Sequence, residues 1–124
     1  DTVLSGVRVL VIDDAPDNQQ LIWSYLSPKG AIIESAENGL VGVRMAQAGH
    51  YDIVLMDIQM PEMDGYTATN KLRTSGYQKP IIALTAHAMN EVRDKILKLG
   101  ANAHMAKPID ADLLISLIAE LVRR

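Results

Sequence analysis

Short apolar runs alternate regularly along the chain with longer segments of helical periodicity. Five short stretches rich in Val, Ile, Leu and Ala are expected to form strands; they cover residues 7–12, 31–36, 53–56, 80–84 and 103–106. Apolar runs of this length are typical of strands that are buried on both faces of a parallel sheet.

In the segment after each run, apolar residues recur every three or four positions. The first helix is expected to begin at Pro16 or Asp17, and the others to cover about residues 40–48, 66–74, 90–99 and 111–123. Asp110 is a favourable N-cap for the last of them. Gly42 lies inside the second helix, where glycine lowers helix stability by about 1 kcal/mol relative to alanine. Its presence indicates either a loose helix or close packing. Strands alternating with helices predict an α/β fold with a parallel sheet and right-handed crossovers.

Length and composition exclude several classes of protein. The 124 residues suit one domain, which we expect over residues 7–124, with residues 1–6 as the stub of a linker. The chain does not begin with methionine, which agrees with a piece of a longer protein. It has no cysteine, so disulfides, cysteine–zinc sites and thiol chemistry are excluded, and a reducing compartment suits it.

Charge and hydropathy bear on the partners. The net charge of −3 and the scattered Lys and Arg residues argue against a nucleic-acid-binding surface. The longest apolar runs, residues 9–12 and 53–56, are far shorter than the roughly 18 residues of a membrane helix, so we expect no membrane insertion by this domain. We expect a cytoplasmic location, which is compatible with a membrane-anchored parent protein.

Ionisable and polar residues stand where the expected strands end. Asp13 and Asp14 follow the first strand, Asp57 the third, Thr85 the fourth and Lys107 the fifth. In an open α/β sheet the ligand-binding crevice lies outside the carboxyl ends of the strands. These side chains, far apart in sequence, are therefore expected to meet at one edge of the sheet.

Three carboxylates in one crevice repel each other and call for a cation. Oxygen ligands without His or Cys favour a hard ion, Mg²⁺ or Mn²⁺. A lysine beside such a site would neutralise phosphoryl oxygens, and a threonine hydroxyl would donate a hydrogen bond to one. The pattern predicts a phosphoryl-transfer site with a carboxylate nucleophile.

Four segments carry a family resemblance that spans nearly the whole chain: residues 9–14 (VLVIDD), 56–65 (MDIQMPEMDG), 84–86 (LTA) and 106–108 (AKP). Together they resemble the receiver domain of two-component response regulators. This resemblance implies a single-domain flavodoxin-like fold, a five-stranded parallel sheet of order 2-1-3-4-5 with five helices. Leu4 and Gly6 before the first strand and residues 84–89 (LTAHAM) are similar to receivers of hybrid sensor histidine kinases.

The resemblance also assigns roles at the acidic cluster. Asp57 would be the phosphoacceptor, taking a phosphoryl group from a phosphohistidine. Asp14 and Asp57 would ligate Mg²⁺ directly, Asp13 through water, and the backbone carbonyl of Gln59 would add a ligand.

Further roles are implied around the phosphoryl group. Lys107 would bind it, Thr85 would turn toward it as the switch residue, and the small Ala86 would leave room for it. The Lys107–Pro108 bond would be cis. Two positions before Lys107 the family usually has Tyr or Phe as a second switch; this chain has Met105, so we expect a weaker or differently built switch.

Several readings of the function stay open at this stage. The domain would assist its own phosphorylation and dephosphorylation, with a histidine kinase or a histidine phosphotransfer domain as partner, and the parent protein would itself be a histidine kinase. Alternatives are a stand-alone response regulator, a receiver-like interaction module that is not phosphorylated, and a metal-dependent phosphatase. The phosphatase reading is disfavoured because Gln59 stands where such enzymes carry a second acid.

The last helix has a second apolar stripe, Ile115, Ala119 and Val122, beside the stripe expected to face the core. A helix that is apolar on two sides suggests a contact beyond its own core, either a homodimer or an intramolecular contact with another domain.

Overall fold

The computed structural model describes residues 3–87 and 89–123 as five strands that alternate with five α-helices. The strands are β1 (Arg8–Ile12), β2 (Ile32–Ala36), β3 (Ile53–Asp57), β4 (Ile81–Thr85) and β5 (Ala103–Ala106). The helices are α1 (Pro16–Leu26), α2 (Gly39–Ala48), α3 (Gly65–Thr74), α4 (Asn90–Lys98) and α5 (Ala111–Val122), and a short 3₁₀ helix, Ser27–Lys29, follows α1. These bounds agree closely with the predicted segments.

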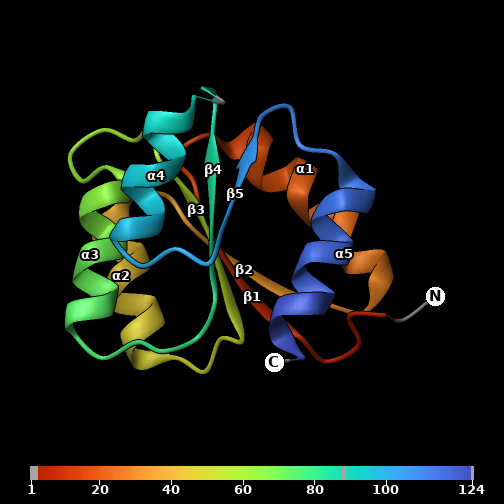
Figure 1. Cartoon of the computed structure of the whole chain (residues 1–124). Coiled ribbons are helices and arrows are strands. Elements are labelled where there is room, and N and C mark those ends of the chain that lie inside the picture. Colours follow the sequence, from red (N-terminus) through yellow and green to blue (C-terminus); the bar gives the residue numbers. More distant parts are fainter. Residues whose placement is uncertain (1–2, 88, 124) are drawn as a thin grey trace.

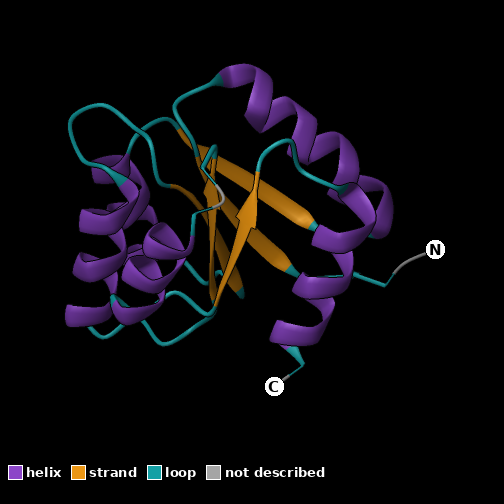
Figure 2. Cartoon of the chain, turned by 45° about the horizontal axis from the view of Figure 1, so that its top comes forward, coloured by secondary structure: helices purple, strands orange, loops and turns teal. Residues whose placement is uncertain are grey.

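All strand pairs are parallel, and the sheet order is β2-β1-β3-β4-β5, which confirms the predicted topology. Helices α1 and α5 cover one face of the sheet, and α2, α3 and α4 cover the other (Figures 1 and 2). The central strands β3 and β4 are buried along their whole length, as their continuous apolar sequences predict. Every strand therefore ends at the same edge of the sheet.

Short polar side chains begin three of the helices. Asn38 accepts a hydrogen bond from the backbone N–H of Val41 at the start of α2, and Asp64 accepts one from Thr67 at the start of α3. Asp110 caps α5 through the N–H of Leu113, as predicted. These caps fix where each helix starts after its loop and so help to set the path of the loops around the sheet edge.

Gly42 is closely packed rather than loose. A Cβ atom on this residue would lie 2.5 Å from Cδ1 of Ile12, so α2 approaches β1 more closely than any other residue would allow. Gly65 makes a comparable approach at the start of α3, where a Cβ would lie 2.5 Å from the backbone oxygen of Asp57. Both contacts hold helices against the strand ends that carry the acidic residues.

The N-terminal stretch packs more closely than a linker would. Leu4 is fully buried in the core beneath α1 and α5, and its N–H donates to the carbonyl of Lys29. The N–H of Gly6 donates to the carbonyl of Gly30. The expected linker over residues 1–6 is therefore wrong at residues 4–6, which belong to the folded unit; residues 1 and 2 lie outside the described part.

The second apolar stripe of α5 is partly covered by the domain itself. Ala119 is buried, and Ile115 and Val122 pack against the same core as Leu114 and Ile118. A homodimer or interdomain contact through this stripe therefore stays a prediction. Within the described ranges, none of the helices is long and apolar enough to cross a membrane.

Candidate functional site

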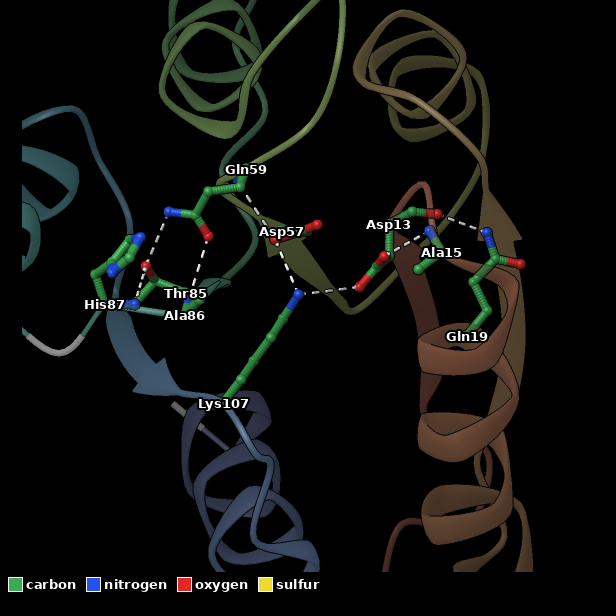
Figure 3. Close-up of polar contacts among 9 residues, drawn as sticks. All are labelled: Asp13, Ala15, Gln19, Asp57, Gln59, Thr85, Ala86, His87 and Lys107. Atoms are coloured by element: carbon green, nitrogen blue, oxygen red, sulfur yellow. Dashed lines mark hydrogen bonds and ion pairs between the residues drawn. The ribbon is translucent and has the colours of Figure 1, made fainter.

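The carboxyl edge of the sheet brings the predicted residues together. Asp13 and Asp14 directly follow β1, Asp57 and Thr85 are the last residues of β3 and β4, and Lys107 directly follows β5. Figure 3 shows the Lys107 side chain reaching between Asp57 and Asp13. The cis peptide bond predicted between Lys107 and Pro108 is present.

Lys107 links two buried carboxylates. Its Nζ donates a hydrogen bond to Oδ1 of Asp57 at 3.1 Å and lies 3.6 Å from Oδ2 of Asp13. The side chain of Lys107 is 22% exposed, whereas those of Asp57 and Asp13 are 3% and 0% exposed. One ammonium group therefore faces two anions that are largely removed from water, and it cannot neutralise both.

The acidic residues form a candidate metal site. Asp13, Asp14 and Asp57 each offer a carboxylate oxygen, and these three oxygens lie within 4.8 Å of one another. Oδ1 of Asp13 accepts a hydrogen bond from the N–H of Ala15, but its Oδ2 is buried and has no hydrogen-bond donor among the described residues. A buried, unsatisfied carboxylate oxygen beside two others fits a hard divalent cation. Asp14 is exposed and leaves the cluster open to solvent on its side.

The electrostatics of Asp57 reflect this crowding. Burial raises the pKa of its carboxyl above the ordinary value, and the charge of Asp13 raises it further. The hydrogen bond and charge of Lys107 and the backbone N–H of Gln59 act in the opposite direction but do not cancel the rise. A cation would therefore favour the ionised carboxylate that a nucleophile needs.

Thr85 is fully buried, and its hydroxyl faces the neighbouring loop. Its Oγ1 accepts hydrogen bonds from Nε2 of Gln59 at 3.1 Å and from the N–H of His87 at 3.1 Å. Oε1 of Gln59 in turn accepts a hydrogen bond from the N–H of Ala86 at 3.2 Å. From the sequence, only the backbone carbonyl of Gln59 was expected to take part in the site. No spacing pattern predicts that its side chain connects Thr85 with Ala86.

Met105, the expected second switch residue, is buried. Its side chain is buried in the core beneath α1 and α5, and its strand partner Leu84 belongs to the same core. The preceding residue, His104, pairs with Ala83, which belongs to the core under α2, α3 and α4. The packing therefore gives no support to a switch at Met105.

His104 on β5 is partly buried. Its Nε2 is buried and has no hydrogen-bond partner among the described residues. Burial, together with the charge of Arg93 on α4, lowers the pKa of the imidazole. Its strand partner Ala83 belongs to the core under α2, α3 and α4, so His104 lies on that face of the sheet.

The family described as "Response regulator receiver domain" matches residues 9–119. Among curated relatives, the sensor histidine kinase RcsC of Escherichia coli (strain K12) is 35% identical over 121 residues, or 95% of this chain and 13% of that protein. The sensor protein GacS of Pseudomonas syringae pv. syringae is 38% identical over 116 residues, or 90% of this chain and 13% of that protein. The chain thus spans about an eighth of the length of these relatives.

Solved structures agree with this match. The Francisella response regulator 1452 receiver domain superposes with a TM-score of 0.92 at 28% identity, covering 96% of this chain and 98% of that one. The receiver domain of sensor histidine kinase PA1611 from Pseudomonas aeruginosa PAO1, solved with a magnesium ion in its active site cleft, gives 0.88 at 34% identity, covering 97% and 100%. With the parallel sheet and the acidic edge described above, these likenesses show that the chain belongs to the response regulator receiver domain family.

Proposed function

We propose that this domain accepts a phosphoryl group on Asp57 from a phosphohistidine and so acts as a switch in a two-component phosphorelay. The observation that carries this proposal is the position of Lys107 between the buried carboxylates of Asp57 and Asp13, beside the exposed Asp14. Such a site combines a nucleophilic carboxylate with positive charge held for phosphoryl oxygens.

In the transfer step, a carboxylate oxygen of Asp57 attacks phosphorus in line with the phosphorus–nitrogen bond of the donor. A phosphorus–oxygen bond forms, the phosphorus–nitrogen bond breaks, and its electron pair returns to the imidazole of the donor. The ammonium group of Lys107, already 3.1 Å from Oδ1 of Asp57, is placed to stabilise charge that builds up on the phosphoryl oxygens.

Asp13, Asp14 and Asp57 would hold the divalent cation, with the backbone carbonyl of Gln59 as a further ligand. Bound there, Mg²⁺ would supply charge neutralisation among the carboxylates and toward the incoming phosphoryl group. Mn²⁺, which accepts the same oxygen ligands, is the expected substitute. The buried Oδ2 of Asp13, which lacks a donor, supports this assignment.

After transfer, the aspartyl phosphate adds about two negative charges to the site. Thr85 would turn its hydroxyl toward the new oxygens, and Ala86, the small neighbour of Thr85, leaves space for them. The result is a shift between two conformations of the loop between β4 and α4. Hydrolysis of the acyl phosphate returns the domain to its first state.

The proposal includes the context of the domain. The curated relatives are sensor kinases that are much longer than this chain, so we place it in a hybrid sensor histidine kinase, on the cytoplasmic side. Its partner is then the phosphohistidine of a kinase or of a histidine phosphotransfer domain. Sequencing the flanking gene tests this: a kinase core beside the receiver supports the hybrid context, and an isolated receiver contradicts it.

The central test is labelling with acetyl phosphate and Mg²⁺, followed by intact-mass analysis and peptide mapping. We expect one phosphoryl group per chain, located on Asp57, and none in Asp57→Asn. Asp112→Asn, which changes an exposed carboxylate at the start of α5, is the matched control and should label like the unmodified chain. Stoichiometric labelling of Asp57→Asn would refute the assignment. Continuous release of phosphate from external substrates would favour a phosphatase instead.

A further inference from the structure

We propose that the side-chain amide of Gln59 is a latch that holds the unphosphorylated conformation of the loop between β4 and α4. The inference deepens the proposed function and rests on it. It concerns a positioning residue: Gln59 acts through the groups that it occupies, Thr85 and Ala86.

Gln59 contacts both the acceptor carboxylate and the loop. Its backbone N–H donates to Oδ1 of Asp57 at 3.3 Å. Its side chain donates from Nε2 to Oγ1 of Thr85 at 3.1 Å and accepts at Oε1 from the N–H of Ala86 at 3.2 Å (Figure 3). One residue of the β3–α3 loop is therefore bonded both to Thr85, the last residue of β4, and to Ala86, the first residue of the loop that follows.

The side chain of Gln59 is hydrogen-bonded to the Thr85 hydroxyl and to the Ala86 N–H. A phosphoryl group on Asp57 would need these same two groups. Phosphoryl oxygens only accept hydrogen bonds, so they compete with Oε1 for the N–H of Ala86 and require the Thr85 hydroxyl as a donor. In the present arrangement Oγ1 of Thr85 instead accepts from Nε2 of Gln59 and from the N–H of His87. The amide and the phosphoryl group are therefore alternative partners for the same loop.

The burial of Thr85 and the exposure of Gln59 favour hydrogen bonds that can be released over a permanent structural contact. Thr85 is fully buried, so its hydroxyl needs a partner in both conformations. Gln59 is exposed, so its amide can leave the loop and be hydrated by water without a desolvation penalty. The exchange leaves no buried polar group unsatisfied in either state.

The latch weakens phosphoryl binding, because only molecules with a released loop are competent to bind. Two neutral hydrogen bonds of ordinary net strength keep the released fraction small. Removing both should strengthen the binding of a phosphoryl analogue by about 5-fold or more.

The test is an equilibrium titration of the Mg²⁺-saturated domain with beryllofluoride, a phosphoryl analogue, read from the backbone amide NMR signals of Ala86 and His87. The variant is Gln59→Met, which keeps the length of the side chain and removes the amide, with Gln59→Ala as a second variant. Gln47→Met is the matched control, because Gln47 is an exposed glutamine on α2.

We expect both Gln59 variants to bind beryllofluoride more tightly, by about 5-fold or more, with their free-state Ala86 signal shifted toward the bound position. Gln47→Met should match the unmodified chain. Unchanged or weaker binding in folded Gln59 variants overturns the latch. If the unmodified chain neither binds the analogue nor labels on Asp57, the proposed function fails instead, so the two failures are distinguishable.

Discussion

Replacing Gly42 by alanine tests how closely α2 packs on the strand that leads to Asp13. In an open helix this change should stabilise the protein by about 1 kcal/mol, because alanine has the higher helix propensity. In this structure the new Cβ would lie 2.5, 2.6 and 2.8 Å from Cδ1, Cγ1 and Cγ2 of Ile12. Favourable carbon–carbon contacts are about 3.5–4.0 Å, so all three are short by roughly 1 Å.

Ile12 has little room to move, because it is fully buried in β1 between β2 and β3. Overpacking of this kind costs about 1–3 kcal/mol, and three simultaneous short contacts place it in the upper half of that range. After the gain in propensity is subtracted, Gly42→Ala should lower the free energy of unfolding by about 1–2 kcal/mol. Urea unfolding followed by circular dichroism measures this loss, with an unchanged denaturant slope.

A double-mutant cycle isolates the cause. Ile12→Ala removes all three clashing atoms and should itself lower the free energy of unfolding by about 2–5 kcal/mol. In that background Gly42→Ala should become stabilising, because only the propensity gain remains. Gln47→Gly, at an exposed position of the same helix, measures the cost of glycine in α2. Stabilisation by Gly42→Ala in the unmodified chain would refute the packing argument.

Three further predictions concern the charged residues. Mg²⁺ should raise the melting temperature of the unmodified chain by relieving the repulsion among its carboxylates, and Asp13→Asn should lose most of that rise. No shift in the melting temperature at millimolar Mg²⁺ would contradict the metal site. Because burial raises the pKa of Asp57 in the folded state, its ionised form opposes folding above the ordinary pKa near 3.8. Without Mg²⁺, Asp57→Asn should therefore be stabilising at pH 7, and this gain should vanish at pH 3, as urea unfolding at both pH values can check. Arg73 donates hydrogen bonds to the backbone carbonyls of Gly100, Tyr77 and Lys79 and to the side chain of Asn102. Arg73→Lys should therefore lower the free energy of unfolding by about 2–4 kcal/mol. An unchanged urea midpoint would show that this network is dispensable.

The pattern of strand ends determined most of the site in advance. Short apolar runs followed by Asp13, Asp57 and Lys107 were enough to predict that these side chains meet, because parallel strands place their carboxyl ends at one edge of the sheet. That rule explains why Lys107 and Asp57 meet although they are 50 positions apart, and the structure then gives the distance of 3.1 Å between Nζ and Oδ1. The start of α5 at Asp110 was also predictable, since an N-cap acts within one turn of its own helix.

Two features could be read only from the tertiary structure: the side-chain contacts between loops, and the side of the sheet to which each residue of a short strand points. The bridge from Gln59 to Thr85 and Ala86 depends on how two loops approach each other, which neither loop encodes by itself. In β5 the residues on both faces are at least partly buried, so no alternation of polar and apolar residues showed which way Met105 points. The order of the elements and the charged residues at their ends could therefore be predicted, because they depend on local periodicity and on sheet geometry. Side-chain partners across loops and the packing of Leu4 and Gly42 required the folded chain, because they arise only when distant segments meet.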